Sequence, residues 1–219
     1  MANSTTAAIV LAAGKGTRMK SDLPKVLHPI AGRPMIGHVL ASLAPLNPAS
    51  VVVVVAPGME SVSKAVAPHP SAIQAEQLGT GHAVLAAKDA LGQARAASDK
   101  SPGDILILYG DTPFISTATF ERLLARRRAA DRPAAVVLGM RPTDPGEYGR
   151  LIADGEGRLE AIVEYRDATA AQRRIGLCNS GVMAVDGALL WELLAEVGND
   201  NAKGEYYLTD IVALARRRG

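Results

Sequence analysis

Apolar residues occur along the chain in short, continuous runs that amphipathic stretches separate. Runs without polar alternation are typical of strands whose two faces are both covered by helices. Four such runs, rich in β-branched residues, lie at residues 7–13, 51–56, 104–111 and 134–140. Stretches with the apolar spacing of a helix lie between and after them, at residues 33–46, 58–68, 79–98 and 116–131. The pattern therefore predicts buried strands that alternate with helices.

Two of the predicted helices also carry end signals. Pro34 suits a first helical turn, and Pro45 predicts the end of the same helix. Ser116 is placed to cap the helix at residues 116–131, whose buried stripe is predicted at Phe120, Leu123 and Leu124. The alternation predicts a Rossmann-like α/β fold, with an open, mainly parallel sheet, helices on both faces and right-handed crossovers.

The order of elements changes after about residue 145. Residues 148–167 predict two strands joined by the short turn Asp154-Gly155-Glu156-Gly157, which is a hairpin and not a further crossover unit. A further strand at 177–186 and two helices at 188–197 and 209–218 complete the chain. We expect one domain over residues 1–219, in which residues 145–186 form a β-rich lobe over the sheet edge.

Composition narrows the classes of function. The net charge is only +2 and aromatic residues make up 4% of the chain, so neither a nucleic-acid partner nor a base-stacking platform is expected. Cys178 is the only cysteine, which excludes an internal disulfide and a cysteine-rich zinc site. No basic region precedes the first apolar run, which therefore predicts a strand and not a secretory signal. We expect a cytoplasmic protein without a membrane partner.

The loop after the first predicted strand combines glycines with cations. The strand ends at Ala12 or Ala13, so Gly14 and Gly16 fall at the edge of the sheet where ligands bind in such folds. Met19 replaces the third glycine of a Rossmann fingerprint, and the P-loop spacing is absent. Arg18 and Lys25 follow the glycines, as a site for a polyphosphate requires. Two exposed loop cations remain the alternative.

Seven motifs in order make a family resemblance specific. They are LxxGxGTRM with LPK (11–25), QAEQLGTGHA (74–83), YGD (109–111), EYGRLI (147–152), IVE (162–164), CNSG (178–181) and GEYYLTD (204–210). From about residue 6 to its end, the chain resembles the sugar-phosphate nucleotidyltransferases. Within them, it is similar to the N-terminal uridyltransferase domain of the bacterial bifunctional N-acetylglucosamine-1-phosphate uridyltransferase / glucosamine-1-phosphate acetyltransferases.

This resemblance implies a fold and a reaction. The fold would be that of nucleotide-diphospho-sugar transferases, with a sugar-binding β-rich lobe. The substrates would be UTP and N-acetylglucosamine 1-phosphate, and Mg²⁺ the cofactor. The products, UDP-N-acetylglucosamine and pyrophosphate, would arise by in-line attack on the α-phosphate, in the synthesis of cell-wall and lipopolysaccharide precursors. The nucleophile is already an anion, so the reaction needs no activated serine, cysteine or histidine.

Asp111 is the candidate metal ligand, because it ends an apolar strand at the ligand-binding edge. A helix cap before Thr112 and Pro113 is the alternative role. The resemblance implies that Arg18, Lys25 and Asp111 are catalytic. It also implies that the nucleotide contacts Leu11, Ala12, Ala13, Gly14, Lys25, Gln74, Gly79 and Thr80. The sugar phosphate would contact Tyr109, Gly110, Asp111, Gly149, Glu164, Asn179, Tyr207 and Thr209.

Several of these residues also have ordinary structural interpretations. Asn179 suits a turn, Tyr207 suits packing, and Glu164 is placed to pair with Arg166 or Arg150. The four histidines lack ligand-like spacing, and none is assigned to catalysis.

The full-length family has features that this sequence lacks. They are a second metal ligand, an Asn beyond residue 219, and a C-terminal left-handed β-helix that transfers acetyl groups and forms trimers. We therefore expect a truncated, monomeric fragment with reduced activity, cut from a homotrimeric protein. Two alternatives stay open: a related nucleotidyltransferase for another sugar phosphate or base, and a non-catalytic module that senses nucleotide sugars.

Overall fold

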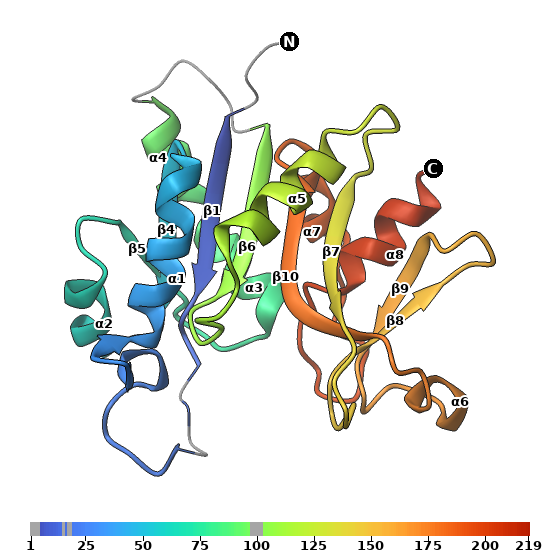
Figure 1. Cartoon of the computed structure of the whole chain (residues 1–219), viewed down its shortest axis with the longest axis horizontal. Helices are drawn as coiled ribbons and strands as arrows, with labels where there is room; N and C mark the ends of the chain where they lie inside the picture. Colours follow the sequence, from blue (N-terminus) through green and yellow to red (C-terminus); the bar gives the residue numbers. More distant parts are fainter. Residues whose placement is uncertain (1–4, 15, 17–18, 97–102) are drawn as a thin grey trace.

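A twisted, eight-stranded sheet forms the centre of the computed structural model, which describes residues 5–14, 16, 19–96 and 103–219 (Figure 1). Its strands pair in the order β5-β4-β1-β6-β10-β8-β9, and β7 also pairs with β10. The strands of this sheet are β1 (Thr6–Leu11), β4 (Ser50–Val55), β5 (Ser71–Ile73), β6 (Asp104–Tyr109), β7 (Ala135–Met140), β8 (Arg150–Ala153), β9 (Leu159–Val163) and β10 (Cys178–Asp186).

One half of the sheet is parallel and contains the most apolar runs. β4, β1 and β6 are parallel neighbours, with Ile9 opposite Val52 on one side and Ile107 on the other. β10 runs antiparallel to β6 and β7. The predicted α/β sheet with mostly parallel strands is therefore confirmed, and the reversal of β10 marks the change from crossover connections to hairpins.

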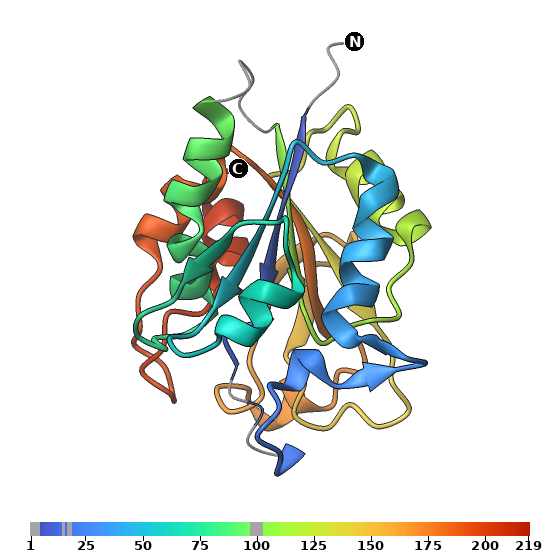
Figure 2. The same cartoon turned by 90° about the vertical axis from the view of Figure 1, so that its left-hand side faces the viewer.

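Helices cover both faces of the sheet, as the unbroken apolar runs predicted (Figure 2). Ile9 and Leu11 pack on the face that α3, α4, α7 and α8 cover, whereas Ala8 and Val10 face α1, α2 and α5. The helices are α1 (Met35–Leu43), α2 (Glu60–Ala65), α3 (Thr80–Ala86), α4 (Lys88–Ala96), α5 (Thr117–Arg127), α6 (Ala170–Arg173), α7 (Leu189–Glu196) and α8 (Asp210–Arg217). Short 3₁₀ turns lie at Lys25–Leu27 and Ala44–Leu46, and β2 (Pro29–Ile30) pairs with β3 (Arg33–Pro34).

Two local predictions need correction. The helix predicted at residues 79–98 is divided into α3 and α4 at Ala87, whose N–H donates to Val84 three residues back, so the chain tightens there. Ser116 does occupy the N-cap position of α5, but its hydroxyl lies 3.2 Å from Oγ1 of Thr119 and caps no backbone N–H. The predicted stripe of Phe120, Leu123 and Leu124 is buried.

The region predicted as a β-rich lobe contributes strands to the same sheet. β8 and β9 form the predicted antiparallel hairpin, and the pairing of Cys178 with Arg150 joins it to β10. Helix α8 packs against β9 and supports the hairpin from one side (Figure 1). The boundaries of the lobe stay a prediction.

None of the helices in the described part of the chain has the length and apolar character needed to cross a membrane.

Candidate active site

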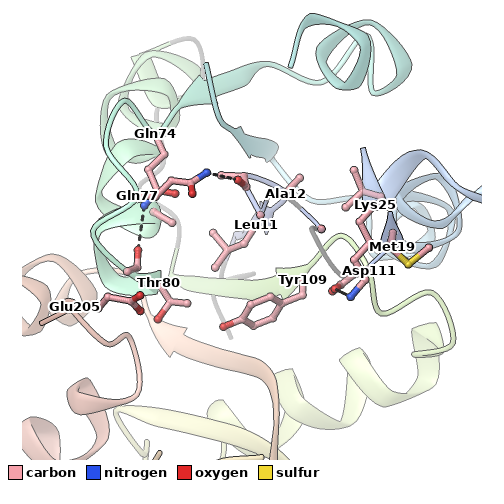
Figure 3. A pocket seen from close by; sticks show the side chains of 16 residues that line it. Leu11, Ala12, Met19, Lys25, Gln74, Gln77, Thr80, Tyr109, Asp111 and Glu205 are labelled. Carbon is pink, nitrogen blue, oxygen red and sulfur yellow. Dashed lines mark hydrogen bonds and ion pairs between the residues drawn. The ribbon is translucent and has the colours of Figure 1, made fainter. Parts of the chain in front are cut away.

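A cavity of about 470 Å³ opens where β1 and β6 end, at the carboxyl edge of the parallel strands (Figure 3). All eight residues predicted to contact the nucleotide line this cavity, which we call the nucleotide cavity. Gln74 lies at one end and the pair Lys25 and Asp111 at the other, with Leu11 and Tyr109 between them (Figure 3). The tertiary structure thus brings together Lys25 and Asp111, which are 86 positions apart in the sequence.

The loop after β1 is held close to the sheet and to Lys25. Ala12 donates its N–H to Val54 at 2.8 Å, and the Gln77 side chain donates to the Ala13 carbonyl at 2.8 Å. Gly16 has φ of +60°, and a Cβ there would lie 2.7 Å from Cβ of Lys25. Glycine is therefore required for both its conformation and its close approach. The catalytic residue predicted at Arg18 lies outside the described residues.

Lys25 and Asp111 form an ion pair at the wall of the nucleotide cavity. Nζ of Lys25 lies 2.6 Å from Oδ2 of Asp111, and both side chains are partly exposed. Within the described residues, Oδ1 of Asp111 accepts no hydrogen bond, so it is available to a ligand. Helix α5 begins only at Thr117, which shows that the alternative role of Asp111 as a helix cap is wrong.

The described residues contain no group of three or more His, Cys, Asp or Glu side chains that could hold a metal by themselves. Asp111 is the carboxylate that the nucleotide cavity places beside Lys25. A single carboxylate of this kind can share a cation with phosphate oxygens and water.

Gln74, Gly79 and Thr80 form the end of the cavity opposite Asp111. Nε2 of Gln74 donates to the Gly79 carbonyl at 3.0 Å. Gly79 has φ of +112°, and a Cβ there would lie 2.6 Å from the Tyr206 carbonyl oxygen. This close contact shows why the position is glycine and joins the segment to a distant loop.

The distant loop is residues 206–208, and three hydrogen bonds hold it against residues 78–81. Tyr206 donates its N–H to Leu78 at 2.7 Å and accepts from Gly81 at 2.8 Å. The N–H of Leu208 donates to Oγ1 of Thr80 at 2.9 Å. We call these three bonds the clasp; they hold the segment that carries Tyr207 and leads to Thr209 against residues 78–81.

Two of the eight residues predicted to contact the sugar phosphate line a second, more polar cavity of about 360 Å³, whereas Tyr109 and Asp111 line the nucleotide cavity. Glu164 and Tyr207 line it, and Thr209 donates to Oε1 of Glu164 at 3.3 Å. Gly149 adjoins the same carboxylate, because a Cβ there would lie 3.4 Å from Oε1. Asn179 donates its backbone N–H to the Gly149 carbonyl at 2.8 Å. We call this space the sugar cavity.

Burial controls the protonation of the polar groups in the sugar cavity. Tyr207 is 7% exposed, and its hydroxyl has no hydrogen-bond partner within the described chain. Loss of water, together with the carboxylates of Asp167, Glu205 and Glu164, raises the pKa of Tyr207 to about 12. Burial also raises the pKa of Glu164, against the opposing effects of the Thr209 hydrogen bond and the Lys203 charge. Tyr207 therefore remains a proton donor at neutral pH.

Tyr109 ends β6 and lines the nucleotide cavity, and Gly110 follows it. Burial, with the charges of Glu164 and Asp111, raises the pKa of Tyr109 well above its usual value. Gly110 donates its N–H to Leu11 at 2.9 Å and is buried. Gly181 has φ of +86°, and a Cβ there would lie 2.5 Å from the Tyr109 ring. Gly181 thus allows the bend in β10 to approach the ring.

The structure supports the alternative, structural role considered for Asn179 and contradicts the one considered for Glu164. Oδ1 of Asn179 accepts from the Gly181 N–H at 2.9 Å, so this side chain does stabilise a turn. Within the described residues, Glu164 forms no ion pair with Arg166 or Arg150, and that interpretation is wrong. Arg150 instead turns its guanidinium toward backbone carbonyl oxygens.

Arg150 is a residue that the sequence analysis missed. It is only 2% exposed, and its guanidinium donates to the carbonyl oxygens of Pro145, Gly146, Tyr148 and Arg173. These contacts join the loop before β8 to the end of α6, beside the sugar cavity. A charged residue inside the apolar start of β8 is the sequence signal that could have identified it.

Other lining residues were also missed. Met19, Gln77 and Glu205 line the nucleotide cavity, and Glu147, Tyr165, Arg166 and Lys203 line the sugar cavity. Gln77 and Glu205 lie inside motifs that carried the family resemblance, so their neighbours provided a signal. Glu147 also lies inside such a motif, whereas Lys203 lies beside one on an exposed loop, where single sequences carry little information about a site.

Comparison with known proteins identifies a family and several curated relatives of this chain. Residues 8–176 match the family described as the MobA-like NTP transferase domain. The chain is 63% identical over 219 residues to the bifunctional protein GlmU of Paramagnetospirillum magneticum. This alignment covers 100% of this chain and 47% of that protein. It is 64% identical over 214 residues to the bifunctional protein GlmU of Rhodospirillum rubrum, covering 98% of this chain and 46% of that protein. The chain thus spans about half the length of these curated relatives.

The fold itself has a solved counterpart. The crystal structure of UDP-glucose pyrophosphorylase complexed with UDP-glucose superposes with a TM-score of 0.75, over 98% of this chain and 88% of that chain. The two sequences are 14% identical, so this likeness concerns the fold alone. It confirms the predicted fold of nucleotide-diphospho-sugar transferases.

Proposed function

This chain belongs to the MobA-like NTP transferase domain family, and from that premise we propose that it transfers a uridylyl group from UTP to N-acetylglucosamine 1-phosphate. The products are UDP-N-acetylglucosamine and pyrophosphate. The observation that carries the proposal is the pairing of Lys25 with Asp111 at one end of a cavity whose other end contains Gln74. The similarity to bifunctional GlmU proteins, which confirms the resemblance inferred from the motifs, supports it.

The reaction requires positioning and charge more than a protein nucleophile. A phosphate oxygen of the sugar 1-phosphate forms the new bond to the α-phosphorus of UTP, and the bond from that phosphorus to the departing pyrophosphate breaks. Lys25 stands where its ammonium group would stabilise the negative charge on these oxygens. The loss of one such preorganised charge typically raises the barrier by about 3 kcal/mol, or roughly 100-fold in rate.

The residues present fit a magnesium–nucleotide site. Mg²⁺ usually takes one or two protein carboxylates and completes its shell with phosphate oxygens and water. Asp111 provides one carboxylate, with Oδ1 accepting no hydrogen bond within the described residues. When bound, the ion would neutralise phosphate charge and orient the reacting groups. Asp111 is the residue proposed to hold it.

The remaining residues are proposed to contact the uridine of UTP and the sugar of the sugar 1-phosphate. Gln74 would contact the uridine, because it lies at the end of the nucleotide cavity away from Lys25 (Figure 3). The backbone from Leu11 to Gly14 lines the same cavity and would also contact the nucleotide. Glu164, with Thr209 bonded to it, would accept hydrogen bonds from sugar hydroxyls. Tyr207 would donate one, since its pKa keeps the phenol protonated.

Pyrophosphate release from UTP with a panel of sugar 1-phosphates tests the proposal. We expect Mg²⁺-dependent release with N-acetylglucosamine 1-phosphate, and loss of about 99% of that rate in Lys25→Ala. Lys64→Ala is the matched control, because Lys64 is an exposed lysine on α2, outside both cavities. Normal turnover in a folded Lys25→Ala protein would refute the assignment.

The same assay separates the alternatives. Faster turnover with dTTP or GTP than with UTP would indicate a related transferase for another base. Tight binding of a UDP-sugar without metal dependence or turnover would indicate a sensing module.

A further inference from the structure

The side-chain amide of Gln74 is held in one orientation inside the nucleotide cavity. Gln74 directly follows β5 and is only 4% exposed. Nε2 lies 3.0 Å from the Gly79 carbonyl oxygen, a contact drawn in Figure 3, and 3.3 Å from Nδ1 of His82. The same end of the amide therefore meets two groups of the protein.

The chemistry of these two groups fixes which end of the amide is which. A carbonyl oxygen can only accept, so the atom beside Gly79 must belong to the NH₂ group. The second hydrogen of that NH₂ is directed to Nδ1 of His82, which can accept it only as a neutral imidazole with its proton on Nε2. Both donors of Gln74 are then used.

The oxygen of the amide has no such partner. Within the described residues, Oε1 of Gln74 accepts no hydrogen bond, and it is not among the fully buried polar atoms left without a partner. Because Gln74 lines the nucleotide cavity, Oε1 is the part of the amide that remains for a ligand. The cavity thus offers an acceptor at this position, and not a donor.

We propose that His82 is a positioning residue that sets base selectivity by holding Gln74 with Oε1 as its free end. An acceptor here selects a base with a ring N–H, such as uracil, whose N3 carries a hydrogen. It rejects cytosine, whose N3 has a lone pair that would face the lone pairs of Oε1. A site built for one hydrogen-bond pattern discriminates strongly, because the wrong base leaves a desolvated polar group unpaired. The inference rests on the proposed function only in placing a nucleotide in this cavity.

The position of His82 suits this role. It lies on the first turn of α3, two residues after Thr80, between the buried residues Gly81 and Ala83. The clasp ties this turn to residues 206–208 through the bonds of Gly81 and Thr80. The backbone next to His82 is therefore held in place, so that Nδ1 of the imidazole meets Gln74 at a fixed position. Without that acceptor, one N–H of a nearly buried amide would have no partner, and only the bond to the Gly79 carbonyl would oppose rotation of the amide.

Two variants of nearly matched shape separate this role from general packing. His82→Leu places carbon where Nδ1 was, whereas His82→Asn carries its Oδ1 the same number of bonds from Cα and keeps an acceptor. Each protein is titrated calorimetrically with UTP and with CTP in the presence of Mg²⁺. We expect the unmodified chain to prefer UTP, and H82L to lower the UTP/CTP affinity ratio by about tenfold, the effect of one lost hydrogen bond. H82N should retain most of the ratio.

The results that would overturn the role of His82 differ from those that would refute the proposed function. An H82L protein with the parent's UTP/CTP ratio, or an H82N protein that behaves like H82L, would overturn the role of His82. Binding of UTP without pyrophosphate release would refute the proposed reaction and leave the selectivity comparison valid. A parent chain that binds neither nucleotide would overturn both.

A measurement on the unmodified protein does not depend on the folding of any variant. In nitrogen-15 spectra of the histidine rings at neutral pH, Nδ1 of His82 should appear as an unprotonated nitrogen and Nε2 as a protonated one. A proton on Nδ1 would contradict the proposed orientation of Gln74.

Discussion

Glu164 shows how a single residue in the sugar cavity can trade stability for binding. Its carboxylate is partly buried, and loss of water is the main cause of its raised pKa. One hydroxyl, that of Thr209, donates to it at 3.3 Å. A carboxylate in this position has capacity to accept a hydrogen bond from a ligand, such as the proposed sugar, but its charge costs stability while the cavity is empty.

Glu164→Gln should therefore stabilise the protein at neutral pH. The folded-state pKa is raised above the ordinary value of 4.5, so the stability linked to protonated Glu164 is present below pH 4.5 and is lost as pH rises through the folded pKa. The gain in melting temperature of the variant should be largest at neutral pH and should shrink toward acid pH. Thermal denaturation at pH 4 and pH 8 checks the sign. An advantage that grows toward acid pH would contradict it.

At the scale of elements, Arg150 connects the loop before β8 with the end of α6. Its guanidinium donates to four backbone carbonyl oxygens, including that of Gly146 at 3.0 Å. The loop carries Glu147 and leads to Gly149, which adjoins Glu164. The planar, five-donor group of arginine can meet this set of acceptors, whereas the ammonium of lysine cannot span them. Arg150 thus positions one wall of the sugar cavity.

Arg150→Lys should raise the KM for the sugar 1-phosphate by about tenfold, as expected when buried hydrogen bonds to the binding loop are lost. The KM for UTP should change little, because neither Arg150 nor any residue whose carbonyl it contacts lines the nucleotide cavity. Steady-state kinetics with each substrate varied in turn gives both values. Equal changes in the two KM values would indicate general loss of structure and contradict the positioning role.

A cluster of charged residues anchors α5 to the amino-terminal end of β6, away from both cavities. Arg127 and Asp104 are 3% and 2% exposed. Arg127 also pairs with Asp186, and Arg128 donates to Asp104 at 2.7 Å. Charges buried this deeply are stable only with their partners present, so the cluster fixes the packing of α5 on the sheet.

Arg127→Met should destabilise the fold by about 3 kcal/mol, because it leaves buried carboxylates with fewer partners. Arg126→Met is the matched comparison on the same helix. Arg126 pairs with Asp131 at the surface, and its loss should change stability by less than about 1 kcal/mol. Urea unfolding of both variants measures the difference. A cost for Arg127→Met as small as that for Arg126→Met would contradict the importance of burial.

At the scale of the whole molecule, the two halves of the sheet hold different parts of the candidate site. The nucleotide cavity lies at the ends of the parallel strands, whereas the sugar cavity adjoins β8, β9 and the loop before α8. The clasp between residues 78–81 and 206–208 connects them. The position of residues 78–81 beside the nucleotide cavity therefore fixes the segment that carries Tyr207 and Thr209 through these hydrogen bonds.

Gly79→Ala should disrupt this connection. Its φ of +112° disfavours any L side chain, and its new Cβ would lie 2.6 Å from the Tyr206 carbonyl oxygen. We expect a loss of about 2 kcal/mol or more in stability, with weakened binding of both substrates. Gly92→Ala is the control, since Gly92 lies inside α4 with open space around its Cβ, and should stabilise the helix by about 0.5–1 kcal/mol. Unfolding curves for the two variants should shift in opposite directions.

The sequence alone determined the features that repeat locally. Continuous apolar runs indicated strands covered on both faces, and β1, β4 and β6 are found there. Ordered motifs indicated the family and most residues of the nucleotide cavity, but only Glu164 and Tyr207 among the residues that line the sugar cavity. The break at Ala87 and the lack of a side-chain cap from Ser116 were missed, because packing and competing side-chain contacts overrode local preference.

Only the tertiary structure decided which side chains meet. The pairing of Lys25 with Asp111, the orientation of Gln74 by His82, the turn of Arg150 toward backbone carbonyls and the clasp each join groups that lie in different loops or turns. Local pattern reports the burial of a segment, because burial repeats with the period of a helix or strand. It does not report the direction of a single polar side chain, which depends on the partner that folding brings within about 3 Å.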